Sequence, residues 1–256
     1  MARRPAATAA HGPIFFTGKA LTFLRALKRN NDGEWFRAHR ADYVTHIQEP
    51  LHRLLDTLRD DLHDVAPELA CTPRESTFRM YRDTRFSEDK TPMKAHVAWS
   101  LRPRGFPKGF AAGLYAQFDP TETWIGGGLY HPEPAVRTAE REHIAAHHRR
   151  LTAIVQAPAF RTHLGALEGD TLTRVPRGFD PAHPAADYVK FKDWMVSRSL
   201  AGTFVTDPAF YPTLLAIFRA AAPLIRFLNE PIAALGASGP MLPRRPKPRG
   251  VERGVR

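Results

Sequence analysis

The sequence predicts a single α+β domain, in which an antiparallel sheet of about four to five strands carries packed N- and C-terminal helices. Two observations support this fold class. Apolar residues recur at helical spacing near both ends of the chain, and they alternate with period two in the middle. The alternating segments are joined by connections too short to hold the crossover helices that parallel strands require. We place the domain at residues 13–236, between tails at 1–12 and 237–256 that we expect to be disordered.

The N-terminal third is predicted to be helical. A first helix in TGKALTFLRALKRNN carries an apolar stripe of Leu21, Leu24 and Leu27, and the polar residues that follow it end the helix. A second helix is expected from near Glu34, and a third from Pro50 with its leucines on one side.

The middle of the chain is predicted to supply the sheet. The expected strands are STFRMYRD, KAHVAWSLR, GFAAGLYAQFDP and ETWIGGGLY, with a further strand in DWMVSRSL. Tyr115 and Trp124 are expected to line the same sheet face. The glycines 126–128 predict a tight turn or bulge rather than a phosphate-binding loop, because no phosphate-loop motif surrounds them.

Two long helices are predicted in the C-terminal half. One runs from about Pro134 through Val155, and the other runs from about Pro208 to Leu228. His143 and His147 have the spacing of metal ligands on the first of these helices. Their basic neighbours favour a solvated helix face instead, so we predict no metal site.

The formal charge of +11 lies mostly at the chain ends. Residues 244–256 hold six cations against a single Glu252, and we expect this tail to aid solubility. Non-specific contact of the tail with nucleic acid is the alternative interpretation. No apolar run approaches ~18 residues, and the single Cys71 has no partner for a disulfide. We therefore expect a cytoplasmic protein without a membrane segment.

The stretch RDTRFSEDKTPMK, residues 82–94, concentrates charge of both signs directly after a predicted strand. Arginine and lysine in such a cluster suit a phosphate- or carboxylate-bearing ligand, while neighbouring carboxylates orient them. The candidate ligand-binding residues are Arg79, Arg85, Lys90 and Lys94. The candidate supporting residues are Arg82, Asp83, Asp89 and His96. His96 is a potential acid or base because it follows the cluster on the next strand.

Two other interpretations of the same stretch remain open. Asp83, Glu88 or Asp89 could hold a divalent metal in a hydrolase or nuclease, although the spacing is a weak match to such enzymes. Alternatively, the charges pair with one another in a structural or partner-binding protein. The sequence contains no nucleophile elbow, dinucleotide fingerprint, or haem or flavin signature, so it predicts no particular cofactor and no particular reaction.

Several segments carry a family resemblance. FFTGKALTFLRALKRNNDGEWF, FRMYRDTRFSEDKTPMK, GLYAQFDPTETWIGGGLYHPEP, VPRGFDPAHPAADYVKFKDWMVSRSL and APLIRFLN together cover roughly residues 14–229. In these segments the chain resembles the bacterial and fungal family known as domain of unknown function 2461. Met93 stands where the family pattern tends to carry an aromatic residue. The resemblance implies a family but no reaction.

Overall fold

The computed structural model describes residues 11–83, 88, 90–106 and 110–238. Helices occupy both ends of this range. The N-terminal ones are α1 (Gly18–Arg29), α2 (Gly33–Ala38), α3 (Arg40–Tyr43), the π-helical turn η1 (Val44–Gln48), α4 (Glu49–Asp61) and α5 (Pro73–Ser76). The C-terminal ones are α6 (Pro134–Ala146), α7 (His148–Gln156), α8 (Pro158–His163), α9 (Ala186–Val189), the 3-10 turn η2 (Gly202–Thr206) and α10 (Phe210–Ser238).

The sheet has five antiparallel strands in the order β1-β2-β3-β4-β5. Their bounds are β1 (Leu69–Ala70), β2 (Val97–Pro103), β3 (Gly113–Phe118), β4 (Glu122–Leu129) and β5 (Trp194–Ala201). Each strand neighbours the next in the chain, as expected for a meander with short connections. The predicted single-domain α+β fold with an antiparallel sheet is confirmed.

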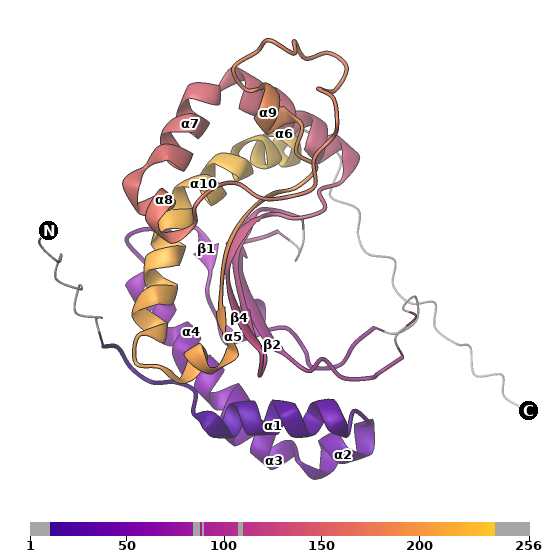
Figure 1. The fold of residues 1–256 in the computed structure, drawn as a ribbon, viewed down its shortest axis with the longest axis vertical. Coiled ribbons are helices and arrows are strands. Elements are labelled where there is room, and N and C mark those ends of the chain that lie inside the picture. The colour runs from indigo at the N-terminus through magenta and orange to yellow at the C-terminus, as the bar shows by residue number, and fades with distance from the viewer. Residues whose placement is uncertain (1–10, 84–87, 89, 107–109, 239–256) are drawn as a thin grey trace, which may run out of the picture.

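The two faces of the sheet have different environments. Figure 1 shows a strongly curved sheet with α10 along its convex side, whereas none of the long helices lies on the concave side. The convex face carries the buried apolar set of each strand, such as Trp99, Leu114 and Ile125. Period-two alternation therefore leaves the other residues of each strand facing the open, concave side.

Several predicted elements differ from the observed ones. Ser76 ends α5, and residues 77–83 form no named strand. An isolated bridge joins Thr77 to Trp99 of β2, and another joins Tyr81 to Met93. The short β1 was not predicted, because two residues carry no periodic signal. The helix predicted over 134–155 breaks at His147, whose backbone is not helical, and α10 continues ten residues beyond the predicted end.

The glycines 126–128 lie inside β4 and pair one-to-one with β3 and β5, so the predicted tight turn or bulge at this position is wrong. A Cβ atom on Gly126 would approach the Val196 carbonyl oxygen to 2.0 Å. One on Gly128 would lie 2.1 Å from the Trp194 carbonyl oxygen, and the φ of Gly128 is +134°. Glycine is required here because β4 and β5 approach too closely for a side chain.

The helix α10 is long and apolar enough, over Phe210–Leu235, to cross a membrane by length and composition. This differs from the expectation that no segment would reach that length. However, 61% of the qualifying window is buried inside the protein. The core helix of a folded domain has the same properties, and α10 packs on β3, β4 and the helices α6, α7 and α8.

Candidate functional site

A cavity of about 590 Å³ lies on the concave face of the sheet. This volume is in the range of small-molecule pockets. The walls come from β2, β3, β4, β5 and the extended segment before β2. Its lining residues are Phe78, Ser100, Arg102, Ala111, Gly113, Leu114, Tyr115, Gln117, Trp124, Gly127, Gly128, Tyr130 and Met195.

The strand register explains why these side chains meet. Ser100 lies opposite Tyr115, and Gln117 lies opposite Trp124, so all four are on one sheet face. The ring centroids of Tyr115 and Trp124 are 5.5 Å apart, which confirms the prediction that both line the same face. Phe78 continues the aromatic wall, with its centroid 6.0 Å from that of Tyr115.

Backbone pairing holds the described residues that flank the charged segment next to Phe78, which lines this cavity. The amide of Phe78 donates to the Ala98 carbonyl, and the amide of Lys94 donates to the Met80 carbonyl. The Asn31 side chain, 62 residues away, clamps the Met93 backbone with bonds of 2.9 and 3.0 Å. The segments before and after the charged stretch are therefore held together as a hairpin against β2.

Lys94 is the best placed of the predicted ligand-binding residues. Its ammonium nitrogen lies 5.3 Å from the centroid of the Phe78 ring, and that ring lines the cavity. Burial lowers the pKa of Lys94, and the positive charges of Arg79 and Arg82 lower it further. Within the described part of the chain, no acidic group pairs with Lys94 or with the exposed Arg79. The charge of Lys94 is therefore affected by two other cations and is not offset by a described acid.

His96 joins the same end of the site. It is half-buried, and its pKa is lowered mainly by that burial and then by the charge of Lys94. The negative charge of Asp119 opposes this shift of the pKa. At neutral pH the imidazole is therefore uncharged, and it offers one N–H donor and one acceptor nitrogen.

The other predicted residues lie further from the cavity or outside the described range. Arg82 is half-buried and donates a 3.0 Å hydrogen bond to the Thr91 hydroxyl, whereas Asp83, Glu88 and Lys90 are exposed. Arg85 and Asp89 lie outside the described residues.

Arg102 is a cavity residue that the sequence did not single out. Its guanidinium donates to the carbonyls of Phe106 and Glu75, at 2.9 and 2.6 Å. Two neutral acceptors fix the side chain but leave its charge unopposed among the described residues. The alternation in AWSLRP was the available signal, because it places Ser100 and Arg102 opposite the buried Trp99 and Leu101.

A metal centre has no support in the described part of the chain. Over residues 11–83, 88, 90–106 and 110–238, no group of three or more histidine, cysteine, aspartate or glutamate side chains is arranged to hold a metal ion. His143 and His147 have rings 4.6 Å apart, but the nearest acid to His143 is Glu230, with 3.4 Å between Nε2 and Oε2. Glu230 in turn binds Arg150 through both carboxylate oxygens.

Comparison with known protein families matches residues 19–227 to the family described as a conserved hypothetical protein, DUF2461. The chain belongs to this family. No curated protein and no solved structure matches the chain. The predicted family is thus confirmed for this DUF2461 chain, and its cavity has to be interpreted from its own residues.

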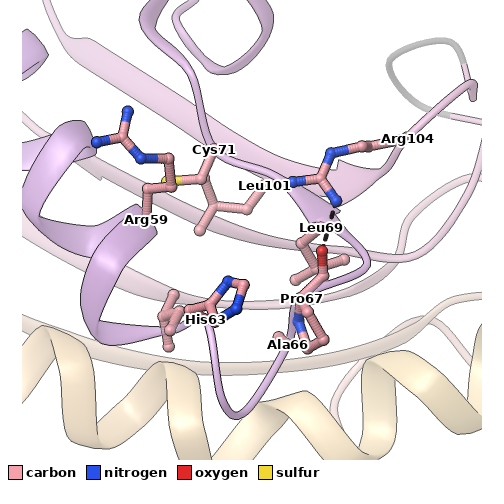
Figure 2. Close-up of a pocket in the computed structure, with 9 residues that line it drawn as sticks. Arg59, His63, Ala66, Pro67, Leu69, Cys71, Leu101 and Arg104 are labelled. Carbon is pink, nitrogen blue, oxygen red and sulfur yellow. Dashed lines mark hydrogen bonds between the residues drawn. The ribbon is translucent and has the colours of Figure 1, made fainter.

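A second, much smaller cavity of about 20 Å³ adjoins Cys71 in the DUF2461 chain. Figure 2 shows Arg59 and Arg104 at its edges, with Arg104 donating to the Pro67 carbonyl at 2.5 Å. This volume holds about one water molecule. Burial raises the pKa of Cys71 to about 12, and its thiol donates to the Leu55 carbonyl. A thiol in this state is a structural group rather than a nucleophile.

Proposed function

We propose that the protein binds a small organic anion in the concave-face cavity. The anionic group, a phosphate or a carboxylate, lies beside Lys94 and Arg79, and the rest of the ligand lies along the aromatic wall. The observation that carries this proposal is the position of the Lys94 ammonium over Phe78, a ring that also lines the cavity. A cation at this place serves both the rim and the interior of the pocket.

Charge supports the same conclusion. Bringing Lys94 close to Arg79 and Arg82 costs free energy, and no described acid offsets it at Lys94. A bound anion would relieve this repulsion and gain charge-assisted hydrogen bonds. Internal pairing of the charges is the competing account. It fits Arg82, which has a partner in Thr91, better than it fits Lys94.

The alternative of a metal-dependent hydrolase has less support. Among the described residues Asp83 and Glu88 are exposed, and neither belongs to a cluster suited to a metal. Asp89 lies outside the described range, as does the basic tail from residue 239 onward. Non-specific nucleic-acid contact by that tail and a cytoplasmic location stay predictions.

Replacing Lys94 with glutamine tests the proposal. We expect the affinity of the full chain for pyrophosphate and citrate, measured by isothermal titration calorimetry, to fall about tenfold, because a charge-assisted contact is lost. Thermal stability should stay the same or rise, since repulsion with Arg79 is relieved. The control Lys19→Gln removes an equal charge from the exposed surface of α1 and should leave affinity unchanged.

Two outcomes would contradict the proposal. Equal affinity in the Lys94→Gln variant and the parent would remove Lys94 from the site. Loss of binding in a variant with Arg244, Arg245, Lys247 and Arg249 all changed to glutamine would instead assign the binding to the tail.

The pH dependence of binding provides a second test. His96 has a pKa below its usual value of 6.5, so it gains a positive charge only in acid. We expect the affinity for sulfate to rise as the pH falls from 7 to 5, because protonation adds a cation next to Lys94. A His96→Asn variant should show a flatter profile. The same slope in both proteins would exclude His96 as the source.

A further inference from the structure

The aromatic wall of the cavity gives more information about the chemical class of the ligand than the nearby cations do. Phe78, Tyr115 and Trp124 come from three separate segments, yet their rings form one chain of contacts with centroids 6.0 and 5.5 Å apart. All three are half-buried and line the cavity. Large apolar rings left partly open to water on a concave surface are typical of a binding pocket rather than of a finished core.

The geometry of these rings suits a flat ligand. Neighbouring rings are inclined at 62° and 69°, so each ring presents a face next to the edge of another. A planar ring lying against this wall can stack on the face of one ring and contact the edge of the next, which are the two preferred aromatic arrangements. A branched aliphatic group would fill the same space without these contacts.

Polar groups beside the wall favour a ring that carries heteroatoms. The Tyr115 hydroxyl donates to the Gln117 Oε1 atom at 2.6 Å, and this bond orients the Gln117 amide. The Gln117 NH₂ group donates no hydrogen bond to another described residue, so this donor is available to a ligand. The Ser100 hydroxyl lies on the same face, one strand away. Together they can bind ring nitrogen or exocyclic oxygen atoms.

We propose that the cavity takes a planar heteroaromatic ring that carries an anionic group, as a nucleoside monophosphate does. The ring stacks within the wall of Phe78, Tyr115 and Trp124, and the phosphate lies at the Lys94 end, where the ammonium overlies Phe78. This inference rests on the proposed function, because the anionic group uses the same cations. It adds the chemical class of the part of the ligand that carries the anionic group.

The test compares adenosine 5′-monophosphate and uridine 5′-monophosphate with ribose 5-phosphate, using calorimetry on the full chain at fixed ionic strength. We expect the nucleotides to bind about tenfold or more tightly than the sugar phosphate, because stacking adds to the phosphate contact. Trp124→Leu should remove most of this difference, because it weakens nucleotide binding far more than the binding of ribose 5-phosphate. Lys94→Gln should weaken both kinds of ligand.

A conservative variant provides a separate readout. Trp124→Phe keeps a ring in the wall, so nucleotide affinity should be largely retained. The quenching of intrinsic fluorescence on nucleotide binding should become smaller, because Trp99 and Trp194 are fully buried and Trp35 lines a different pocket beside α1. Unchanged quenching in this variant would place the base elsewhere and overturn the inference. Circular dichroism of both Trp124 variants checks that they fold.

The outcomes separate the inference from the proposed function. The nucleotides and ribose 5-phosphate could bind with equal affinity, and Lys94→Gln could weaken both. That result would overturn the heteroaromatic class of ligand and leave the proposal of anion binding in place. Nucleotide binding that is the same in Trp124→Leu as in the parent would also overturn it. Absence of binding by all three compounds at millimolar concentration would overturn both proposals.

Discussion

A Gly128→Ala variant is expected to lose about 4 kcal/mol of unfolding free energy, as the sum of backbone strain and overpacking. The new Cβ would lie 2.1 Å from the Trp194 carbonyl oxygen and 2.8 Å from the Met195 Cα, and the φ of +134° is unfavourable for alanine. Because these neighbours are backbone atoms of β5, the clash cannot be relieved by a side-chain rotation. Urea denaturation followed by circular dichroism measures the loss.

The control for this prediction is Gly33→Ala. Gly33 begins α2, and nothing lies within 4 Å of the position that a Cβ would take there, so alanine should change stability by less than about 1 kcal/mol. A Gly128→Ala protein as stable as the Gly33→Ala protein would show that β4 and β5 can separate without cost. The spacing of the cavity floor would then not depend on glycine.

Glu140→Gln is expected to stabilise the protein by about 3 kcal/mol at pH 7. Glu140 is fully buried on α6, and neither of its carboxylate oxygens has a hydrogen-bond partner among the described residues. Burial, with a smaller contribution from the charge of Glu230, raises its pKa from 4.5 to about 9. Folding therefore requires this group to stay protonated, which becomes more costly as the pH rises.

The direction of the pH effect follows from the two pKa values. The folded state binds the proton more tightly than the unfolded state, so this group reduces stability progressively between about pH 4.5 and 9. Glutamine resembles the protonated acid in shape and does not titrate. The gain from Glu140→Gln should therefore fall to about 1 kcal/mol at pH 5 and grow above pH 7.

Denaturant titrations at pH 5, 7 and 8 check this prediction. Glu142→Gln is the matched control, because Glu142 is exposed on the same helix and should give little change at any pH. A stabilisation by Glu140→Gln that does not vary with pH would mean that Glu140 ionises in the folded protein as easily as in the unfolded chain. It would also indicate a water or an ion beside the carboxylate.

Much of the fold could be predicted because it depends on local periodicity. The leucine stripe of α1 and the alternation in β2, β3, β4 and β5 each reflect burial on one side of a regular element. The shared face of Tyr115 and Trp124 followed from the same alternation. The break at His147 could not be predicted, because both flanking helices continue the apolar pattern without a proline or glycine.

The candidate site was predicted only in part. The sequence drew attention to Lys94 through the density of charge around it, and the Lys94 ammonium lies over Phe78, a residue that lines the cavity. It missed Arg102, which gains significance only from the neighbours that surround it in the folded protein. It also assigned the glycines 126–128 to a turn, since the close approach of β4 and β5 leaves no other mark on the sequence.

The sequence by itself determined the class of fold, the order and approximate limits of most elements, and the segment where charge accumulates. These features depend on side chains within a few residues of one another, where the period of burial is visible. Only the tertiary structure decided that the Lys94 ammonium lies over Phe78 and that Asn31 clamps the Met93 backbone. It also decided that Phe78 lines an open aromatic cavity. Such contacts join residues far apart in the chain, and their geometry depends on sheet curvature and strand register, which no local pattern specifies.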